Sequence, residues 1–157
     1  MTAPGRRLQS VALQVLAEAR MAGRSRPSMS PLEDTVMRVI WAKETCTADE
    51  VRQALLRRQP MKESTVRTIL RRLEAKGYVS HEIAGRTYVY RPCLPARRAA
   101  AQAVRQIVDR LCEGSVEQLL QGMVSDRIVT AEQLEELARK VAEAEAGRKQ
   151  EGEGNAT

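Results

Sequence analysis

Hydroxyl and basic side chains recur on one face of a helix predicted to start near Lys62 and to reach Lys76. Successive residues of a helix are rotated by about 100° around its axis, which places these side chains on the side opposite the apolar residues of the helix. The residues of this face are Ser64, Thr65, Arg67, Thr68, Arg71 and Arg72. Short hydroxyls let a helix backbone approach a groove floor, and arginine can bond guanine edges or neutralise phosphates. The face predicts contact with the major groove of duplex DNA, and a merely solvated basic face is the alternative.

The chain offers no set of residues suited to catalysis. Its one histidine, His81, has no carboxylate or cysteine at metal-ligand spacing, so we interpret it as a surface residue of a strand. No glycine-rich phosphate loop and no nucleophile paired with a base are visible in the sequence. The cysteines Cys46, Cys93 and Cys112 are far apart and odd in number, which favours reduced thiols. We therefore expect no enzyme, no cofactor and no metal site.

Three helices must position this face. Ser30 and Thr47 are each followed three residues later by glutamate, the capping-box pattern that opens a helix. Pro60 is expected to end the second helix, and Gly77 stands where a left-handed cap would end the third. The predicted inward residues are Leu32, Val36, Val39 and Ile40, then Val51, Ala54 and Leu55, then Val66, Ile69, Leu70 and Leu73.

After the third helix the apolar period changes to about two residues, which predicts a β-hairpin over residues 78–92 with a turn at residues 84–86. Arg86 at the hairpin tip is a candidate phosphate or minor-groove contact. Tyr88 and Tyr90 lie together on one strand face. Such rings more often pack on the helix, but their hydroxyls could reach phosphate oxygens, and Tyr88 is kept as a candidate contact.

Three helices followed by a hairpin within residues 30–94 are typical of a winged helix-turn-helix DNA-binding domain. The fold class is mostly α with a small β-hairpin, the winged helix being followed by a C-terminal helical dimerisation module. Residues 30–95 carry a net charge of +4 and residues 114–146 a net charge of −4. The net charge is the number of Lys and Arg residues minus the number of Asp and Glu residues. The basic part is expected to face DNA.

The module over residues 95–146 is predicted to hold three helices. Ala96 to Cys112 forms the first, with an apolar stripe of Ala100, Val104, Ile107 and Leu111, and Ser115 and Thr130 cap the other two. Because three short helices bury little surface, an interlocked homodimer is favoured over an intramolecular three-helix bundle. The predicted interface residues are Val104, Ile107, Leu111, Leu119, Leu120, Leu134 and Leu137.

The two ends of the chain are polar. Residues 1–29 carry five arginines against one glutamate and are predicted to form a disordered basic arm or one short amphipathic helix. Translation could instead begin at Met21 or Met29. Residues 147–157 are glycine-rich and predicted to be a disordered tail. No apolar run approaches the length of a membrane span, so we expect a cytoplasmic protein without membrane insertion.

From Ser30 to Ala146 the sequence resembles the penicillinase and methicillin-resistance repressors of the BlaI/MecI type. The most specific matches are Trp41, the run Ser64–Leu73 with Lys76 and Gly77, the wing Gly85–Tyr90, and Gly114 with Ser115. The resemblance implies a winged-helix transcriptional repressor that binds a double-stranded, inverted-repeat operator as a homodimer, with groove contact by Ser64, Thr65 and Thr68.

In that family repression is commonly relieved by proteolysis near the domain junction, under a membrane-bound sensor metalloprotease. The resemblance therefore makes residues 95–107 the candidate cleavage region. The family's cleavage pair contains phenylalanine, which this chain lacks, so neither the scissile bond nor a β-lactam signal carries over. A regulator controlled by direct effector binding and a winged helix used for protein contact remain as alternative functions.

Overall fold

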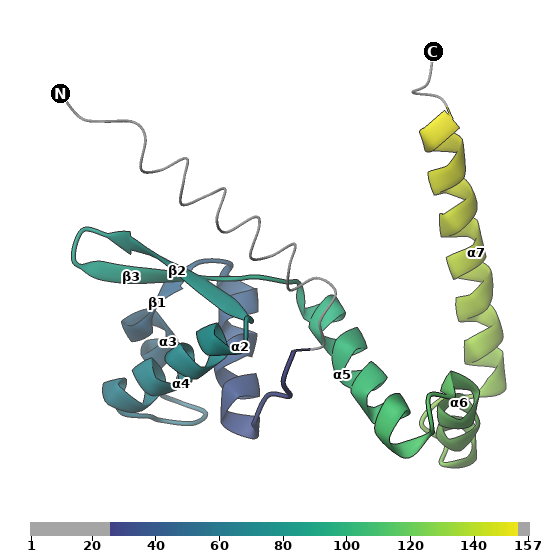
Figure 1. The fold of residues 1–157 in the computed structure, drawn as a ribbon, viewed down its shortest axis with the longest axis horizontal. Helices are drawn as coiled ribbons and strands as arrows, with labels where there is room; N and C mark the ends of the chain where they lie inside the picture. The colour runs from purple at the N-terminus through teal and green to yellow at the C-terminus, as the bar shows by residue number, and fades with distance from the viewer. Residues whose placement is uncertain (1–25, 154–157) are drawn as a thin grey trace. The chain divides into compact units, whose positions relative to one another are not determined.

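The computed structural model describes residues 26–153 (Figure 1). By compactness the chain divides into two units, residues 1–106 and 107–157, and the division lies inside helix α5. The first unit combines three helices with a small antiparallel sheet, and the second is helical. The predicted fold class is confirmed. No helix between residues 26 and 153 has the length and apolar character that a bilayer span requires.

Helix α2 (Pro31–Lys43) begins at the predicted capping box. The Glu33 amide donates to Ser30 Oγ at 3.3 Å, and the Ser30 amide donates to Glu33 Oε2 at 2.8 Å. The inward face differs from the prediction, because Met37 is buried and Leu32 is exposed. Glu33 occupies the inward stripe at this end of the helix, where its carboxylate also meets Lys76 Nζ at 2.7 Å, and this rotates Leu32 toward solvent.

Helix α3 (Ala48–Leu55) also starts with its predicted capping box, at Thr47. Val51 and Leu55 are buried as predicted, but Ala54 is exposed. The helix ends well before Pro60, because the Arg58 and Gln59 amides close a turn onto the Leu55 carbonyl at 3.1 and 2.9 Å. Only one side of this short helix is apolar.

Helix α4 (Glu63–Ala75) carries the predicted stripe, and Val66, Ile69, Leu70 and Leu73 are all buried. The chain leaves the helix through Gly77, whose φ of 82° lies in the left-handed region that glycine tolerates. The Gly77 amide donates to Glu74 O at 3.0 Å and the Tyr78 amide to Leu73 O at 2.9 Å, the paired bonds of a Schellman cap. The predicted end of the helix is confirmed.

The hairpin consists of β2 (Val79–Ala84) and β3 (Thr87–Pro92), joined by Gly85 and Arg86. Ala84 pairs with Thr87 next to the turn. A third strand, β1 (Cys46–Thr47), pairs with the outer edge of β3, giving the sheet order β1-β3-β2. This strand is too short for the alternation of apolar residues to reveal it, so the sequence predicts only the hairpin.

The core of the first unit lies between the three helices and the sheet and extends to the start of helix α5 (Ala96–Leu111). Leu94 and Ala99 are buried in it, and Trp41 Nε1 donates to Leu94 O at 2.9 Å. Burial raises the pKa of the Cys46 thiol to about 11, with Glu50 adding to the effect. Cys46 is therefore a protonated packing residue at neutral pH rather than a nucleophile.

Part of the predicted N-terminal arm is ordered. Arg26 is buried, with 5% of its surface exposed, and Met29 packs against the core. The prediction of a disordered arm is wrong for residues 26–29, because this segment is hydrogen-bonded to Gly77 after α4 and to Gln102 of α5. Its remainder, residues 1–25, lies outside the described residues, so the choice between a disordered arm and a short helix stays a prediction there.

In the second unit, α6 (Val116–Ser125) starts at Ser115, whose Oγ accepts from the Gln118 amide at 3.2 Å. Helix α7 (Ala131–Glu153) starts at Thr130, which forms a capping box with Gln133. The predicted disorder after Gly147 is wrong as far as Glu153, because α7 continues through it. Its Arg, Lys, Gln and Glu residues favour helix, and each of its two glycines, Gly147 and Gly152, costs only about 1 kcal/mol. Residues 154–157 lie outside the described part.

Candidate nucleic-acid interface

The predicted contact face of α4 is open to solvent. All of its residues are exposed, and the four apolar residues on the opposite side of the helix are buried. The exposed residues are Ser64, Thr65, Arg67, Thr68, Arg71 and Arg72. Within residues 26–153, Arg71 takes part in no ion pair, so its guanidinium is available to an anionic partner. The core fixes the direction in which this face points.

The hydroxyl of Thr68 is already engaged, because Oγ1 donates to Ser64 O at 2.9 Å. This bond to the preceding turn uses the hydroxyl proton and leaves the oxygen lone pairs as acceptors. It also fixes the rotamer of the side chain. Thr68 is therefore preset to accept a hydrogen bond or to offer its methyl group to a thymine methyl.

A groove of about 480 Å³ separates α4 from the wing. It brings together three of the predicted contact residues: Arg67 from α4, and Arg86 and Tyr88 from the hairpin. Its other lining residues are Thr47, Ala48, Asp49, Thr87 and Tyr90. Ala48 is the first residue of α3, whose N-terminal amides carry partial positive charge. Two guanidinium groups beside a helix N-terminus suit a phosphate oxygen.

The remaining α4 candidates lie outside this groove. Ser64, Thr65, Thr68, Arg71 and Arg72 are not among its lining residues. The predicted contacts thus form two parts, an open face along α4 and a groove shared by α4, α3 and the wing. The open face suits base edges and the groove suits the backbone of the same duplex.

Arg67 is held by an acidic neighbour one turn earlier. Its Nε and Nη2 donate to Glu63 Oε1 at 2.9 and 2.6 Å, and this bonding raises the pKa of the Arg67 guanidinium. Both side chains are more than half exposed, so the pair adds little to stability. Glu63 orients Arg67 and would compete with any phosphate that approached it.

Replacing Glu63 with glutamine is expected to tighten binding to duplex DNA about threefold, because it removes a negative charge and the competitor for Arg67. Fluorescence anisotropy with a labelled duplex measures the effect. Glu136→Gln is the matched control, because Glu136 pairs with Lys140 one turn later in the second unit. Equal affinities for the two variants would contradict a role for Arg67 in DNA contact.

A cluster of rings supports the wing, and the cluster is linked to α4 by a contact that the sequence alone does not predict. His81 stacks on Tyr88 with ring centroids 4.2 Å apart, and His81 Nδ1 lies 2.5 Å from Glu74 Oε1. Tyr90 is buried, and burial raises the pKa of its hydroxyl. The packing role expected for such rings is thus confirmed for Tyr90, whereas Tyr88 is 45% exposed. Strand alternation places His81, Tyr88 and Tyr90 on one face, which is the signal for this cluster.

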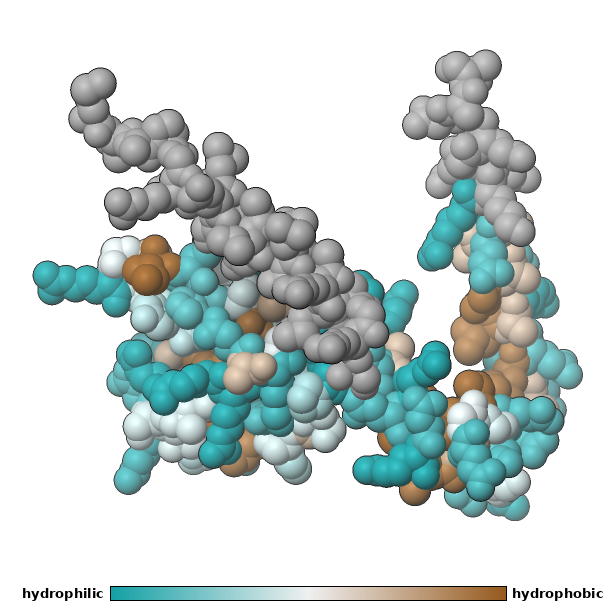
Figure 2. All heavy atoms as spheres, in the orientation of Figure 1, coloured by the Kyte–Doolittle hydropathy of each residue, from teal (hydrophilic) through white to brown (hydrophobic). Residues whose placement is uncertain are grey.

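The predicted interface residues in the second unit remain partly open to solvent. Leu111 is 68% exposed, Leu137 is 56% and Ile107 is 39%. Helix α6 has no buried residue. Figure 2 shows hydrophobic side chains on the surface of α6 and α7. Val104, which belongs to the first unit, is 45% exposed.

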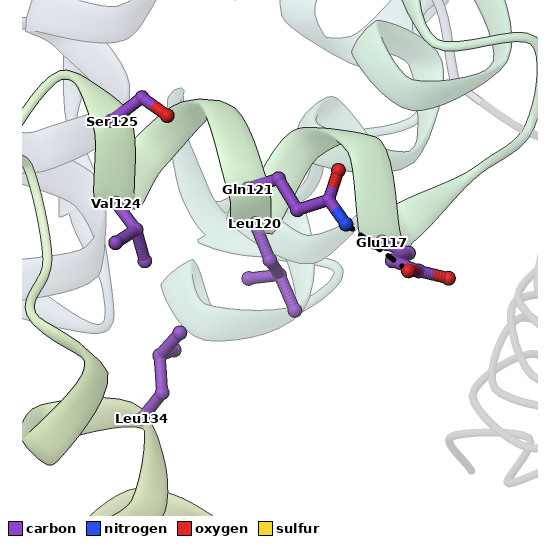
Figure 3. A pocket seen from close by; sticks show the side chains of 6 residues that line it. All are labelled: Glu117, Leu120, Gln121, Val124, Ser125 and Leu134. Carbon is purple, nitrogen blue, oxygen red and sulfur yellow. Dashed lines mark hydrogen bonds between the residues drawn. The ribbon is translucent and has the colours of Figure 1, made fainter.

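An open, largely apolar groove of about 700 Å³ lies between α6 and α7. In Figure 3, Leu120 and Val124 from α6 point toward Leu134 at the start of α7. Gln121 donates to Glu117 Oε1 at 3.1 Å on the rim. Leu119, Leu120 and Leu134 are half-buried. The two helices thus leave apolar surface that their own packing does not fill.

Metal-ligating side chains are scattered. Within residues 26–153, no three of the His, Cys, Asp and Glu side chains come close enough together to hold a metal ion. His81 instead contacts one carboxylate and two tyrosine rings. The described chemistry of the site is that of hydrogen bonding and charge.

Comparisons with known proteins identify relatives of this chain. A family model described as penicillinase repressor matches residues 29–143. The penicillinase repressor of Bacillus licheniformis is 26% identical over 125 residues, covering 80% of this chain and 97% of that protein. The solution structure of the DNA-binding domain of the repressor BlaI is similar, with 33% identity, 46% of this chain and 89% of that chain covered, and a TM-score of 0.43.

A second similar structure is that of monomeric Bacillus licheniformis BlaI in complex with the blaP half-operator. It shares 34% identity, covers 45% of this chain and 85% of that chain, and has a TM-score of 0.40.

Proposed function

Because the chain belongs to the penicillinase repressor family, we propose that it is a sequence-specific, DNA-binding transcriptional repressor that acts as a homodimer on an inverted-repeat operator. The observation that carries the proposal is the exposed face of α4 beside a groove that gathers Arg67, Arg86 and Tyr88. A face of short hydroxyls and arginines over a buried apolar stripe suits the major groove.

In this proposal residues 30–94 contact DNA and residues 95–146 dimerise. Thr68, Arg71 and their neighbours on α4 read base edges, while Arg67, Arg86 and Tyr88 hold the sugar-phosphate backbone. Two copies related by a two-fold axis place their α4 helices about one helical turn of DNA apart. The exposed apolar residues of α5, α6 and α7 support dimerisation, since small helical modules need a second copy to bury such surface.

Repression in this scheme results from occupancy of a promoter, and its relief requires loss of the dimer. We place the relief step at residues 95–107, by proteolysis under a membrane-bound sensor protease. Pro95 and the following arginines are exposed, which supports access for a protease. Cleavage there would separate the DNA-binding part from most of the dimerisation part. Mass spectrometry of the protein recovered from induced cells would locate the cut.

Selection from randomised duplexes with the full-length protein tests the central claim. Enrichment of an inverted repeat is expected, with half-sites centred about one helical turn apart. Recovery of duplexes without a shared sequence would instead favour a winged helix used for protein contact. In that alternative the α4 face would bind an acidic protein surface.

Binding to the selected duplex is expected to weaken steeply with salt. Arginine contacts to phosphates release condensed counterions, so affinity should fall at least about a hundredfold between about 50 and 200 mM salt. Fluorescence anisotropy over a salt series measures the slope. A nearly flat dependence would argue against a phosphate-bound duplex in the groove.

One observation favours a second candidate, control by a directly bound effector. The open groove between α6 and α7 has Leu120, Val124 and Leu134 on its apolar side and has room for a small apolar molecule. Loss of operator binding on addition of such a molecule to the uncleaved protein would distinguish this regulation from proteolysis.

A further inference from the structure

Residues Arg26, Pro27 and Ser28 are here called the strap. They precede α2 in the chain and bridge α5 and the segment just after α4 through hydrogen bonds. Each of their backbone carbonyls accepts a hydrogen bond from a side chain. Pro27 O accepts from the Tyr78 hydroxyl and Ser28 O from Lys76 Nζ, both at 2.8 Å. Arg26 O accepts from Gln106 Nε2 of α5. The strap is therefore held along its whole length by side chains from α5 and from the segment that directly follows α4.

The Arg26 side chain makes the same connection a second time. Its Nε donates to Gly77 O at 2.8 Å, and its Nη1 donates to Gln102 Oε1 at 3.3 Å. Only 5% of Arg26 is exposed, and burying a guanidinium is costly unless its N–H groups are bonded. Gly77 O follows the C-terminal end of α4, where the helix dipole favours a cation. Arg26 thus fits this position by charge as well as by geometry.

The strap occupies one face of α5 only. Gln102 and Gln106 are one turn apart, and with buried Ala99 they form the face turned toward the first unit. The exposed stripe of Ala100, Val104, Ile107 and Leu111 falls on the opposite face at about 100° per residue. One side of α5 is therefore bonded to the strap. On the other side Val104, Ile107 and Leu111 stay exposed, while Val108 beside them is buried within the chain.

We propose that Arg26 is a positioning residue that couples α5, the helix with the exposed apolar stripe, to α4, the helix proposed to contact DNA. The inference rests on the proposed function. Trp41 fixes the start of α5 through Leu94 O, and the strap fixes the next turns against Lys76, Gly77 and Tyr78. Because α5 carries the dimer stripe, its direction relative to α4 sets how far apart two α4 helices lie. Arg26 thereby determines which half-site spacing the dimer accepts.

The test compares Arg26→Ala and Gln102→Ala with the wild-type full-length protein. The probes are the operator duplex recovered by selection, the same duplex with one to three base pairs inserted between the half-sites, and an isolated half-site. Both variants should bind the optimal duplex about tenfold less tightly and discriminate less among spacings, because a loose α5 lowers the effective concentration of the second α4. Binding to the half-site should change less than about twofold.

Amide hydrogen exchange of residues 96–106 provides a readout that does not depend on DNA. Faster exchange in α5 of both variants, with α2 and α4 unchanged, is expected. Arg38→Ala is the control, because Arg38 is an exposed arginine on α2 and its loss removes the same charge. Gln102→Ala removes one hydrogen bond from a helix surface, so it keeps the test valid if Arg26→Ala fails to fold.

Unchanged spacing preference and unchanged α5 exchange in Gln102→Ala and any folded Arg26→Ala protein would overturn the inference while leaving the proposed function intact. Failure of the wild-type protein to select any duplex would instead remove the proposed function. In that case the exchange data alone would decide whether the strap restrains α5.

Discussion

Replacing Leu111 with glutamate is expected to convert the dimer into a monomer and to lower operator affinity at least about a hundredfold, through loss of the linked second half-site. Leu111 is 68% exposed in the single chain and stands at the end of the α5 stripe. A carboxylate there would have to be buried against apolar surface of the partner, which is costly when unpaired. Helix α5 itself should persist, because glutamate is a good helix former.

Analytical ultracentrifugation measures the assembly of this variant, and a duplex titration measures its affinity. Gln118→Glu is the matched control, because it adds the same charge at an exposed position of the second unit outside the predicted interface. A Leu111→Glu protein that still sediments as a dimer would contradict the placement of the interface on this stripe. A monomer with undiminished operator affinity would contradict the need for a dimer.

Replacing Arg71 with alanine is expected to weaken operator binding about 10- to 100-fold, the range for one bidentate contact to a guanine. Arg71 projects from the open face of α4, and within residues 26–153 it has no ion pair to lose. Its removal should therefore leave folding unchanged. It should also relax base preference at one position of each half-site, which a lost phosphate contact would not do.

Selection and anisotropy on the Arg71→Ala protein measure both effects. Arg71→Lys separates charge from geometry, since lysine keeps the charge but loses the planar fork. Arg57→Ala serves as the charge-matched control, because Arg57 is an exposed arginine after α3 and outside the groove. Equal loss of affinity in the Arg57 and Arg71 variants, without any change in base preference, would remove Arg71 from base reading.

Hydrophobic periodicity predicts most of the first unit because each of the helices α2, α3 and α4 buries a single stripe. The four inward residues of α4 and both capping boxes are found where the pattern places them. The pattern fails where a polar residue takes an inward position. Glu33 does so in α2 by capping the helix and pairing with Lys76, so Leu32 turns outward. A pattern that counts only apolar residues cannot register this exchange.

The residues of the candidate site can be predicted from the sequence. Their separation into an open face along α4 and a groove beside the wing cannot. Helix geometry indicates which side chains of α4 are exposed, and the turn chemistry indicates Arg86 at the wing tip. The groove that joins Arg67 to Arg86 and Tyr88 depends on how α3, α4 and the hairpin pack. The link between His81 and Glu74 likewise joins residues on different elements, whose distance no local pattern fixes.

The strap has a consequence for tracing this family through evolution. Its bonds to Tyr78 and Lys76 use backbone carbonyls of Pro27 and Ser28, which every amino acid supplies equally. Alignments would therefore show divergent residues at positions that keep the same contacts. Only the positions whose side chains form the bonds are constrained in residue type. Among relatives we therefore expect a basic residue at position 26 to covary with an amide side chain at position 102.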